Sequence, residues 1–307
     1  MIQIKHKNLD QLARTHCEAI ICYIKSKKKE AVNKSIVDCF GDEWDLKKLI
    51  LAKPIELEKL STINQNKDCN NLTYFETLYS YLTARKNIKF KNADDEPYNA
   101  YQLIKSLGIT VCPYCNRNTI YNLKYSTKRT SELDHFYPKS KYPFFAVSFY
   151  NLIPSCKVCN RLKSDNADKK YINPYDDRFD FNQNAKFALK IKNADFYNNE
   201  KSIKLTCKIN PTTSKDERVR MRNNIKDFKL FDLYQNHKDI ALELIQKEYI
   251  YNESYIDELF RSYEGTLFKN REDVLRLITG GYVRDEELNK RPLSKLVKDI
   301  SEELDLL

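Results

Sequence analysis

Four cysteines in two closely spaced pairs are the residues of this chain best suited to hold a metal. Cys112 and Cys115 form one pair and Cys156 and Cys159 form the other, each with two residues between its members. Such a pair forms a turn whose sulfurs point at one ion, and two pairs complete a tetrahedral zinc site. Because four thiolates fill the coordination shell, we predict a structural zinc that takes no part in catalysis. A redox role for the first pair would require a strand–helix–strand pattern around it, which the sequence lacks.

Asp134 and His135 lie between the two cysteine pairs and are suited to acid–base and metal chemistry. A neutral imidazole, with an ordinary pKa of about 6.5, is a good general base at neutral pH. An aspartate supplies the hard oxygen ligand that Mg²⁺ and Mn²⁺ prefer. Hydrolysis of a phosphodiester needs a deprotonated water and a Lewis acid. The dipeptide therefore predicts a metal-dependent phosphodiesterase in which His135 is the base and Asp134 binds Mg²⁺ or Mn²⁺.

Basic residues surround these groups and indicate a polyanionic partner. Residues 112–170 carry eleven Lys and Arg against four Asp and Glu, and so hold +7 of the net charge of +10. This concentration of charge favours nucleic acid as the partner. Lys163 lies three residues after Asn160, on the same face of a predicted helix, where it could hold a phosphate beside the metal. The candidate nucleic-acid contacts are Lys139, Lys141, Arg161 and Lys163.

Composition indicates a globular chain with two or three units. The 307 residues are 41% hydrophobic and 31% charged, outside the range of disordered chains. No apolar run approaches the roughly 18–20 residues of a membrane span, and the first residues lack the apolar core of a signal peptide. Nine cysteines are an odd number, which fits reduced thiols better than a disulfide framework. We therefore predict a cytoplasmic protein with no membrane partner.

Apolar periodicity predicts the elements that position the motif. Residues 1–108 show helical spacing, with helix ends expected at Gly41 and Gly108 and a helix start at Pro54. The helical period disappears over 109–175, where we expect short strands at 119–125 and 130–136 and a helix over 156–165. A β-hairpin over 187–207 and further helices follow in 176–307. The predicted fold is α+β, mainly α, in three units: 1–108, 109–175 and 176–307.

The motif region resembles the HNH endonuclease family. The resemblance is carried by ELDHFYPKS at 132–140 and YNLIPSCKVCNRLK at 150–163. It implies a ββα-metal module with a treble-clef-like, four-cysteine zinc site, inserted between the helical regions, with His135 as general base. Asn151 then holds the loop of the catalytic histidine. Asn160, at the third motif position, joins Asp134 on the divalent ion.

The residues around His135 are also similar to HNH nucleases of bacterial phage-defence systems of the Septu and retron-associated type. In those systems the nuclease works beside an ATPase. The resemblance implies an antiviral nuclease effector, with DNA the favoured substrate and an ATPase the first candidate partner. Two other functions stay open, a zinc-dependent nucleic-acid-binding module without catalysis and an RNA-directed nuclease or toxin. The combination of Asp134, His135, Asn151 and Asn160 favours catalysis over binding alone.

Overall fold

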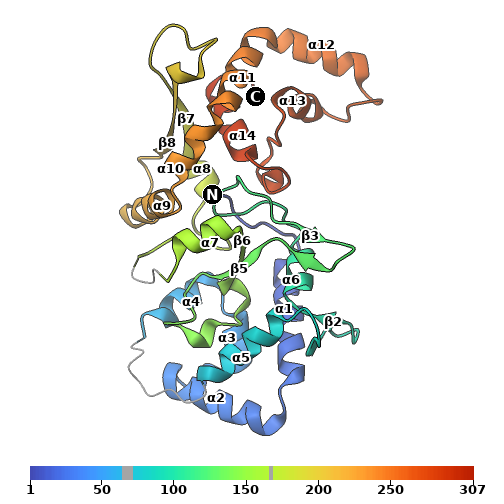
Figure 1. Ribbon diagram of the computed structural model, residues 1–307, viewed down its shortest axis with the longest axis vertical. Coiled ribbons are helices and arrows are strands. Elements are labelled where there is room, and N and C mark those ends of the chain that lie inside the picture. Colours follow the sequence, from blue (N-terminus) through green and yellow to red (C-terminus); the bar gives the residue numbers. More distant parts are fainter. Residues whose placement is uncertain (64–71, 166–168) are drawn as a thin grey trace.

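The computed structural model describes residues 1–63, 72–165 and 169–307, and over these ranges the chain is mainly helical with small two-stranded sheets. Helices from the first 107 residues gather in one half of the molecule, and helices after residue 214 gather in the other (Figure 1). The motif region lies between the two halves (Figure 1). This arrangement agrees with the predicted α+β class.

Amphipathic helices build the N-terminal half around a shared apolar core. Ala13, Cys17 and Ile20 are spaced so that they share one face of the first helix, and all three are buried. The helix ends predicted at Gly41 and Gly108 are confirmed, because both glycines have positive φ, 103° and 66°, which other residues rarely adopt. The helices of this half are α1 (Leu9–Tyr23), α2 (Ser26–Phe40), α3 (Leu46–Leu51), α4 (Pro54–Ser61), α5 (Leu72–Thr83) and α6 (Ala100–Leu107).

A small hairpin and an asparagine cap lead into α6. Strands β1 (Phe90–Lys91) and β2 (Pro97–Tyr98) pair antiparallel. The side chain of Asn99 then accepts hydrogen bonds from the backbone N–H groups of Tyr101 and Gln102. This cap fixes the start of the helix that later supports part of the motif region.

Two antiparallel strand pairs lie in the described part of the motif region. Strand β3 (Asn122–Leu123) pairs with β4 (Lys128–Arg129). Strand β5 (Glu132–His135) pairs with β6 (Leu152–Ser155), which places His135 opposite Leu152. Helix α7 (Lys157–Lys163) follows β6 after one residue and packs against β5. The second cysteine pair therefore lies at the start of α7.

The strands of this region differ in part from those expected at 119–125 and 130–136. Only the short segments β3 and β5 form there, and each pairs with a strand that the sequence did not predict. Strand β6 contains Pro154 and is buried at all four positions. A proline cannot donate to a sheet, and a fully buried strand shows no alternation, so neither usual signal marks β6. The helix expected over 156–165 ends at Lys163.

A β-hairpin and a helical region follow, as predicted. Strands β7 (Ala185–Ile191) and β8 (Ile203–Ile209) pair antiparallel. Helix α14 (Ser294–Glu303) packs along β7, where the Asp299 carboxylate accepts the N–H of Phe187 at 2.8 Å. The other helices are α8 (Phe181–Asn184), α9 (Lys215–Asp227), α10 (Leu230–Tyr234), α11 (Lys238–Ile250), α12 (Glu253–Tyr263) and α13 (Arg271–Thr279). Short 3₁₀ turns are η1 (Pro143–Phe145), η2 (Phe149–Asn151), η3 (Glu200–Ser202), η4 (Gln235–His237) and η5 (Asp285–Glu287).

Both ends of the chain contact the turn that contains the first cysteine pair. The N–H of Ile2 donates to the carbonyl of Pro113 at 2.8 Å. The side chain of Asn116 donates to the carbonyl of Leu288 at 2.7 Å and accepts the N–H of Lys295 at 2.8 Å. The motif region is therefore tied to both flanks, and the division of the chain at residues 108 and 175 stays a prediction. Within the described ranges, no helix combines the length and apolarity that a membrane crossing requires.

Candidate metal centre and active site

The four cysteines predicted to bind zinc lie together. The sulfur atoms of Cys112, Cys115, Cys156 and Cys159 all lie within 4.8 Å of one another, and all four residues are buried. Four sulfurs bound tetrahedrally to zinc at about 2.3 Å lie about 3.8 Å apart. The cluster is therefore positioned to bind a metal ion, and its donor set fits a structural zinc.

Local backbone geometry brings each cysteine pair to the cluster. The N–H of Asn116 donates to the carbonyl of Cys112 at 2.7 Å, and Asn116 itself has a φ of 49°, which asparagine tolerates better than most residues. The second pair uses a helix start: the Cys156 sulfur caps α7 by accepting the N–H of Cys159 at 3.4 Å. One pair therefore depends on a turn and the other on a helix N-terminus.

Further N–H groups point at the sulfurs from outside the cluster. The backbone N–H of Arg117 donates to the Cys115 sulfur at 3.4 Å. The side-chain amide of Asn118 donates to the Cys156 sulfur at 3.2 Å. Hydrogen bonds to a sulfur favour its charged, metal-binding form. These donors are the support that a thiolate–zinc centre needs around its ligands.

His135 is the last residue of β5, and its ring is held in one tautomer. Ring Nε2 lies 3.0 Å from the carbonyl oxygen of Ala146 and must donate to it, because a carbonyl oxygen only accepts. Nδ1 is then the unprotonated nitrogen, and it has no hydrogen-bond partner in the described ranges. Burial lowers the pKa of His135 to about 4. The ring is therefore neutral at pH 7, with Nδ1 unprotonated.

Tyr79 of α5 packs against the ring of His135. The two ring centroids are 4.4 Å apart. The Tyr79 hydroxyl donates to the carbonyl of Leu133 at 3.0 Å, and the Lys139 ammonium lies 5.3 Å from the centroid of the same ring. Tyr79 therefore joins α5, β5 and Lys139 around the histidine. This role of Tyr79 was not predicted, because a tyrosine on an amphipathic helix normally indicates core packing.

Asp134 has a different set of partners from His135, as the alternation of side chains along a strand requires. The Tyr114 hydroxyl donates to its Oδ2 at 2.7 Å. The Lys163 ammonium lies 3.2 Å from Oδ2 and 3.3 Å from Oδ1. Burial raises the pKa of Asp134, while the charge of Lys163 and the hydrogen bond from Tyr114 lower it. Asp134 is therefore held in a buried ion pair on the side of β5 that faces α7.

The structure corrects the position expected for Lys163. This residue is only 2% exposed, and its ammonium also donates to the carbonyl of His135 at 2.6 Å. The sequence placed it on the face of Asn160, three residues earlier. Lys163 is also four residues after Cys159, which is buried on α7, so it shares the inward face of the helix. In this arrangement Lys163 neutralises Asp134 and does not present its charge to a bound nucleic acid.

Asn151 holds together the loop between β5 and β6. Its Oδ1 accepts the N–H of Tyr137 at 2.7 Å. Its Nδ2 donates to the carbonyls of Tyr137 and Phe145, at 3.1 and 2.9 Å. Phe145 precedes Ala146, whose carbonyl accepts the hydrogen bond from His135. The fully buried Asn151 therefore fixes the loop that orients the histidine ring.

Asn160 and Asp134 offer oxygen atoms suited to a divalent ion. Asn160 lies half-buried on α7, and its side chain has no hydrogen bond in the described ranges. Among the described residues, the one hydrogen-bond partner of Asp134 Oδ1 is Lys163 at 3.3 Å, which is longer than a strong charged hydrogen bond. Amide and carboxylate oxygens are the ligands that Mg²⁺ and Mn²⁺ prefer, so the donor types fit such an ion.

The basic surface of the motif region is smaller than the residue count indicates. Lys141 and Arg161 are exposed, and Lys139 is half-buried. Flanking carboxylates pair with two of the other cations: Lys169 lies 2.9 Å from Asp227, and Lys170 lies 3.5 Å from Asp216. Part of the +7 charge is therefore neutralised within the fold.

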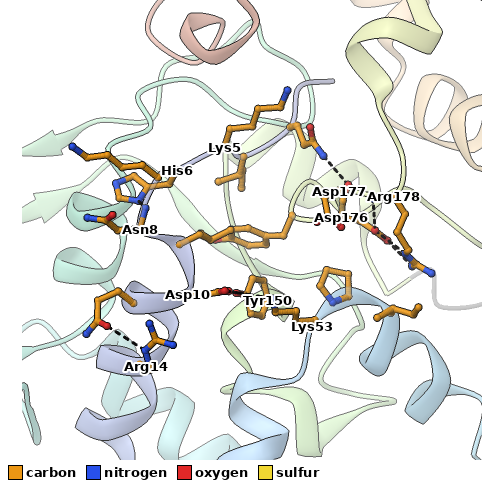
Figure 2. A pocket seen from close by; sticks show the side chains of 18 residues that line it. Lys5, His6, Asn8, Asp10, Arg14, Lys53, Tyr150, Asp176, Asp177 and Arg178 are labelled. Carbon is orange, nitrogen blue, oxygen red and sulfur yellow. Dashed lines mark hydrogen bonds and ion pairs between the residues drawn. The ribbon is translucent and has the colours of Figure 1, made fainter.

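A cavity of about 560 Å³ lies beside the start of α1. Figure 2 shows Asp10 and Tyr150 in contact there, with the Tyr150 hydroxyl donating to the carboxylate at 2.7 Å. Cations and carboxylates both line this cavity, among them Lys5, Arg14 and Asp177 (Figure 2). None of the residues Asp134, His135, Asn151 and Asn160 lines it. It is therefore separate from the candidate active site.

Comparison with known proteins finds similarity over part of the chain. The chain is 37% identical to Septu protein PtuB of Bacillus thuringiensis over 81 residues, which are 26% of this chain and 29% of that protein. It is 34% identical to protein ea31 of Escherichia phage lambda over 74 residues, which are 24% of this chain and 21% of that protein. The match thus spans less than a third of each of these relatives. No family model and no solved structure matches the chain.

Proposed function

We propose that this chain is a metal-dependent endonuclease of the HNH type, which hydrolyses phosphodiester bonds of nucleic acid, with DNA the favoured substrate. The observation that carries the proposal is the state of His135. Its ring is neutral, its Nε2–H donates to Ala146, and its Nδ1 has no hydrogen-bond partner among the residues that the structure describes. The order of β5, β6 and α7 around a four-cysteine cluster supports the same proposal.

His135 acts in this proposal as the general base. Its Nδ1 takes a proton from the attacking water, and the ring becomes positively charged. The hydrogen bond from Nε2–H to the Ala146 carbonyl then strengthens, because a charged donor binds a carbonyl more tightly than a neutral one. Asn151 supports this step by holding the loop that presents Ala146.

The remaining polar groups position the substrate. Asp134 and Asn160 would hold Mg²⁺ or Mn²⁺, which when bound supplies a Lewis acid for the scissile phosphate. Lys139, Lys141 and Arg161 contact the phosphates on either side. Lys163 supports Asp134 from inside the fold.

We further propose a role in anti-phage defence, on the basis of the similarity to Septu protein PtuB. An ATPase that docks on the helical flanks, residues 1–108 and 209–307, is the first candidate partner. Expression of the chain with its neighbouring genes should protect cells from phage, and His135→Ala should abolish the protection. Co-purification from the native host should recover the ATPase; a chain that purifies alone and never protects would contradict this role.

A zinc-dependent nucleic-acid-binding module without catalysis is the second candidate. The ion pair between Asp134 and Lys163 favours it, because the carboxylate is already neutralised. The two candidates differ in one outcome: only the nuclease cleaves its ligand.

A cleavage assay tests the proposal directly. The purified chain is incubated with Mg²⁺ or Mn²⁺ and end-labelled single- and double-stranded DNA and RNA. We expect cleavage by the native chain, with DNA cut faster than RNA, and none after chelation of the ion. His135→Ala should not cleave, whereas His6→Ala, a half-buried histidine outside the motif, should cleave normally. Binding without cleavage under every condition would favour the second candidate, and preferential cleavage of RNA would favour an RNA-directed nuclease or toxin.

A further inference from the structure

The hairpin of residues 121–130, which contains β3 and β4, presents apolar side chains to solvent. Tyr121, Leu123 and Tyr125 are 47%, 43% and 100% exposed. The solvent face of an antiparallel hairpin normally carries polar residues. Exposed apolar side chains gathered on one surface indicate an interaction site.

The pairing register shows that these side chains share a face. Leu123 pairs with Lys128, so both point to the same side of the hairpin. Tyr121 joins them, because side chains alternate along a strand. On the other side, Asn122 donates to the carbonyl of Tyr101 in α6 at 3.0 Å. The hairpin is therefore attached to α6 by one face, while the side chains of the other face are exposed. The hairpin itself lies at the edge of the molecule (Figure 1).

The charge of this hairpin indicates the chemistry of its partner. Residues 121–130 contain Lys124, Lys128 and Arg129 and no acidic residue. Lys124 lies in the turn beside Tyr125, and Lys128 lies on the apolar face. Protein-binding surfaces are depleted in lysine at their core. A nucleic-acid strand instead offers bases that stack on tyrosine and phosphates that attract lysine.

An exposed tyrosine in another hairpin, the 42% exposed Tyr197, differs from Tyr121 and Tyr125 because it has aromatic partners. In the turn between β7 and β8, Tyr197 packs against Phe196, with centroids 4.1 Å apart, and against Tyr249, with centroids 6.1 Å apart. Tyr121 and Tyr125 make no ring contact with any residue in the described ranges. They therefore contribute little to the stability of the fold and remain available to a ligand.

We propose that the 121–130 hairpin binds nucleic acid by stacking Tyr125 and Tyr121 on unpaired bases, while Lys124 and Lys128 contact the adjacent phosphates. The inference rests on the proposed nuclease function and extends it to the choice of substrate. It predicts that the chain prefers a strand with exposed bases, whether single-stranded or locally opened, over a fully paired duplex.

The position of the hairpin in the sequence fits such a role. Thr130, at its base, is five residues before His135. Five residues of fully extended chain reach at most about 18 Å. This distance corresponds to about five nucleotides along one strand of a duplex. The base of the hairpin, where the N–H of Thr130 donates to the carbonyl of Tyr121, would therefore lie within a few nucleotides of the phosphate that His135 faces.

A binding experiment tests the inference in the background of His135→Ala, which prevents cleavage. The ligand is a single-stranded DNA oligonucleotide with 2-aminopurine, whose fluorescence falls when the base stacks on tyrosine. Tyr125→Ala should weaken binding by about 5- to 150-fold, the loss expected for one stacked base, and should restore the fluorescence. Tyr125→Phe should bind like the parent. Tyr249→Ala, which removes a tyrosine that is 79% exposed elsewhere, should have no effect.

The outcomes separate this inference from the proposed function. Unchanged affinity and fluorescence in Tyr125→Ala would overturn the inference even if the native chain cleaves DNA, and would leave a protein partner for the hairpin. A chain that never cleaves but loses DNA binding in Tyr125→Ala would overturn the nuclease proposal and keep the inference. Zinc content and circular dichroism of each variant identify any loss that comes from misfolding.

Discussion

Asp134 and His135 are neighbours in the sequence, yet their side chains lie in two different environments around β5. Toward α7, the Asp134 carboxylate is bound by the Tyr114 hydroxyl and the Lys163 ammonium, close to the cysteine cluster. Toward the loop that joins β5 to β6, one ring nitrogen of His135 donates to Ala146, and the other has no partner in the part of the chain that the structure describes. We call these the α7 side and the loop side.

The difference separates groups that stabilise the fold from a group that can react. A buried carboxylate without a partner costs several kcal/mol, so the α7 side must satisfy Asp134 for the chain to fold. A neutral ring nitrogen without a partner costs only about 1–3 kcal/mol. The loop side can therefore keep Nδ1 open for a substrate or water. We infer that the α7 side serves stability first and that the loop side serves chemistry.

Removal of one cysteine should have the largest effect, and it acts on the α7 side. Cys156→Ser should lose zinc and unfold or aggregate, because binding of a structural zinc is coupled to folding and contributes on the order of 10 kcal/mol. The serine hydroxyl can still cap α7 in place of the sulfur, so loss of the cap would not explain the result. Zinc content by elemental analysis and urea unfolding measure the effect. The exposed Cys22→Ser is the control, and a folded, zinc-free Cys156→Ser would contradict the four-cysteine assignment.

Removal of the histidine should act on the loop side alone. His135→Ala should lower the cleavage rate by about 10²–10⁴-fold, the usual contribution of a general base. Zinc content and nucleic-acid affinity should change little, and the free energy of unfolding should fall by only about 1–3 kcal/mol, because the Ala146 carbonyl loses its hydrogen-bond donor. Single-turnover cleavage and urea unfolding on the same samples check both halves of the prediction. Cleavage at the native rate would remove His135 from the mechanism.

Removal of Lys163 should lower the free energy of unfolding more than removal of His135 does. Lys163→Met leaves Asp134 buried without a counter-charge, which should cost about 3–5 kcal/mol of unfolding free energy. The double variant Lys163→Met with Asp134→Asn should regain much of this loss, because no buried charge then remains. Urea unfolding of the three variants measures the coupling between the two residues. A loss below about 1 kcal/mol in Lys163→Met would show that the ion pair is exposed to water.

The contrast between the two sides also shows what the sequence could predict. The cysteine pairs were predictable, because two ligands in one turn are a local property and the second pair also starts a helix. The buried position of Lys163 was not predictable from the sequence. Its spacing from Asn160 places both residues on one face of a helix but does not say whether that face is buried. Burial of Cys159 decides this, and it depends on tertiary packing. Tyr79 and Tyr114 were missed for the same reason, since each acquires its role from a residue distant in the sequence.

The ends of α2 and α6 were predictable from the glycines that follow them, and the start of α4 from Pro54. The strands of the motif region were harder to predict from the sequence, because they are two to four residues long and one of them, β6, is buried throughout. Strand pairing also depends on which segments meet, which no local pattern encodes. The loop geometry around Ala146 was also not predictable from a local pattern. The family resemblance indicated a role for Asn151, but it did not indicate which carbonyl would accept the hydrogen bond from His135.

Acid should lower the free energy of unfolding through His16, which contacts the loop side. This buried histidine lies 2.9 Å from the carbonyl of Val147 in the loop, and burial lowers its pKa to about 4. Below about pH 6.5 the unfolded chain takes up a proton on His16, whereas the folded chain does so only near pH 4. The folded state therefore loses stability as the pH falls, by about 2 kcal/mol from this residue at pH 5. The variant His16→Gln should be less stable at pH 7 but should lose about 2 kcal/mol less between pH 7 and pH 5, as measured by urea unfolding. An equal pH dependence in both proteins would contradict a lowered pKa.

The smallest expected effect is on the salt dependence of nucleic-acid affinity, and it concerns Lys139 near the loop side. Lys139 lies beside Tyr79 and next to the His135 loop, where it can reach a bound phosphate, whereas Lys163 is enclosed on the α7 side. A lysine that contacts phosphate releases a counterion on binding, so Lys139→Ala should flatten the dependence of log affinity on log salt by about one unit or less. Lys190→Ala, an exposed lysine on β7, should leave the slope unchanged. Binding is measured by anisotropy from 50 to 300 mM salt, taken as roughly the range where such slopes are resolved. If Lys139→Ala and Lys190→Ala gave the same slope as the native chain, Lys139 would not contact phosphate, and the salt dependence would come from other cations, such as Lys124 and Lys128 of the 121–130 hairpin.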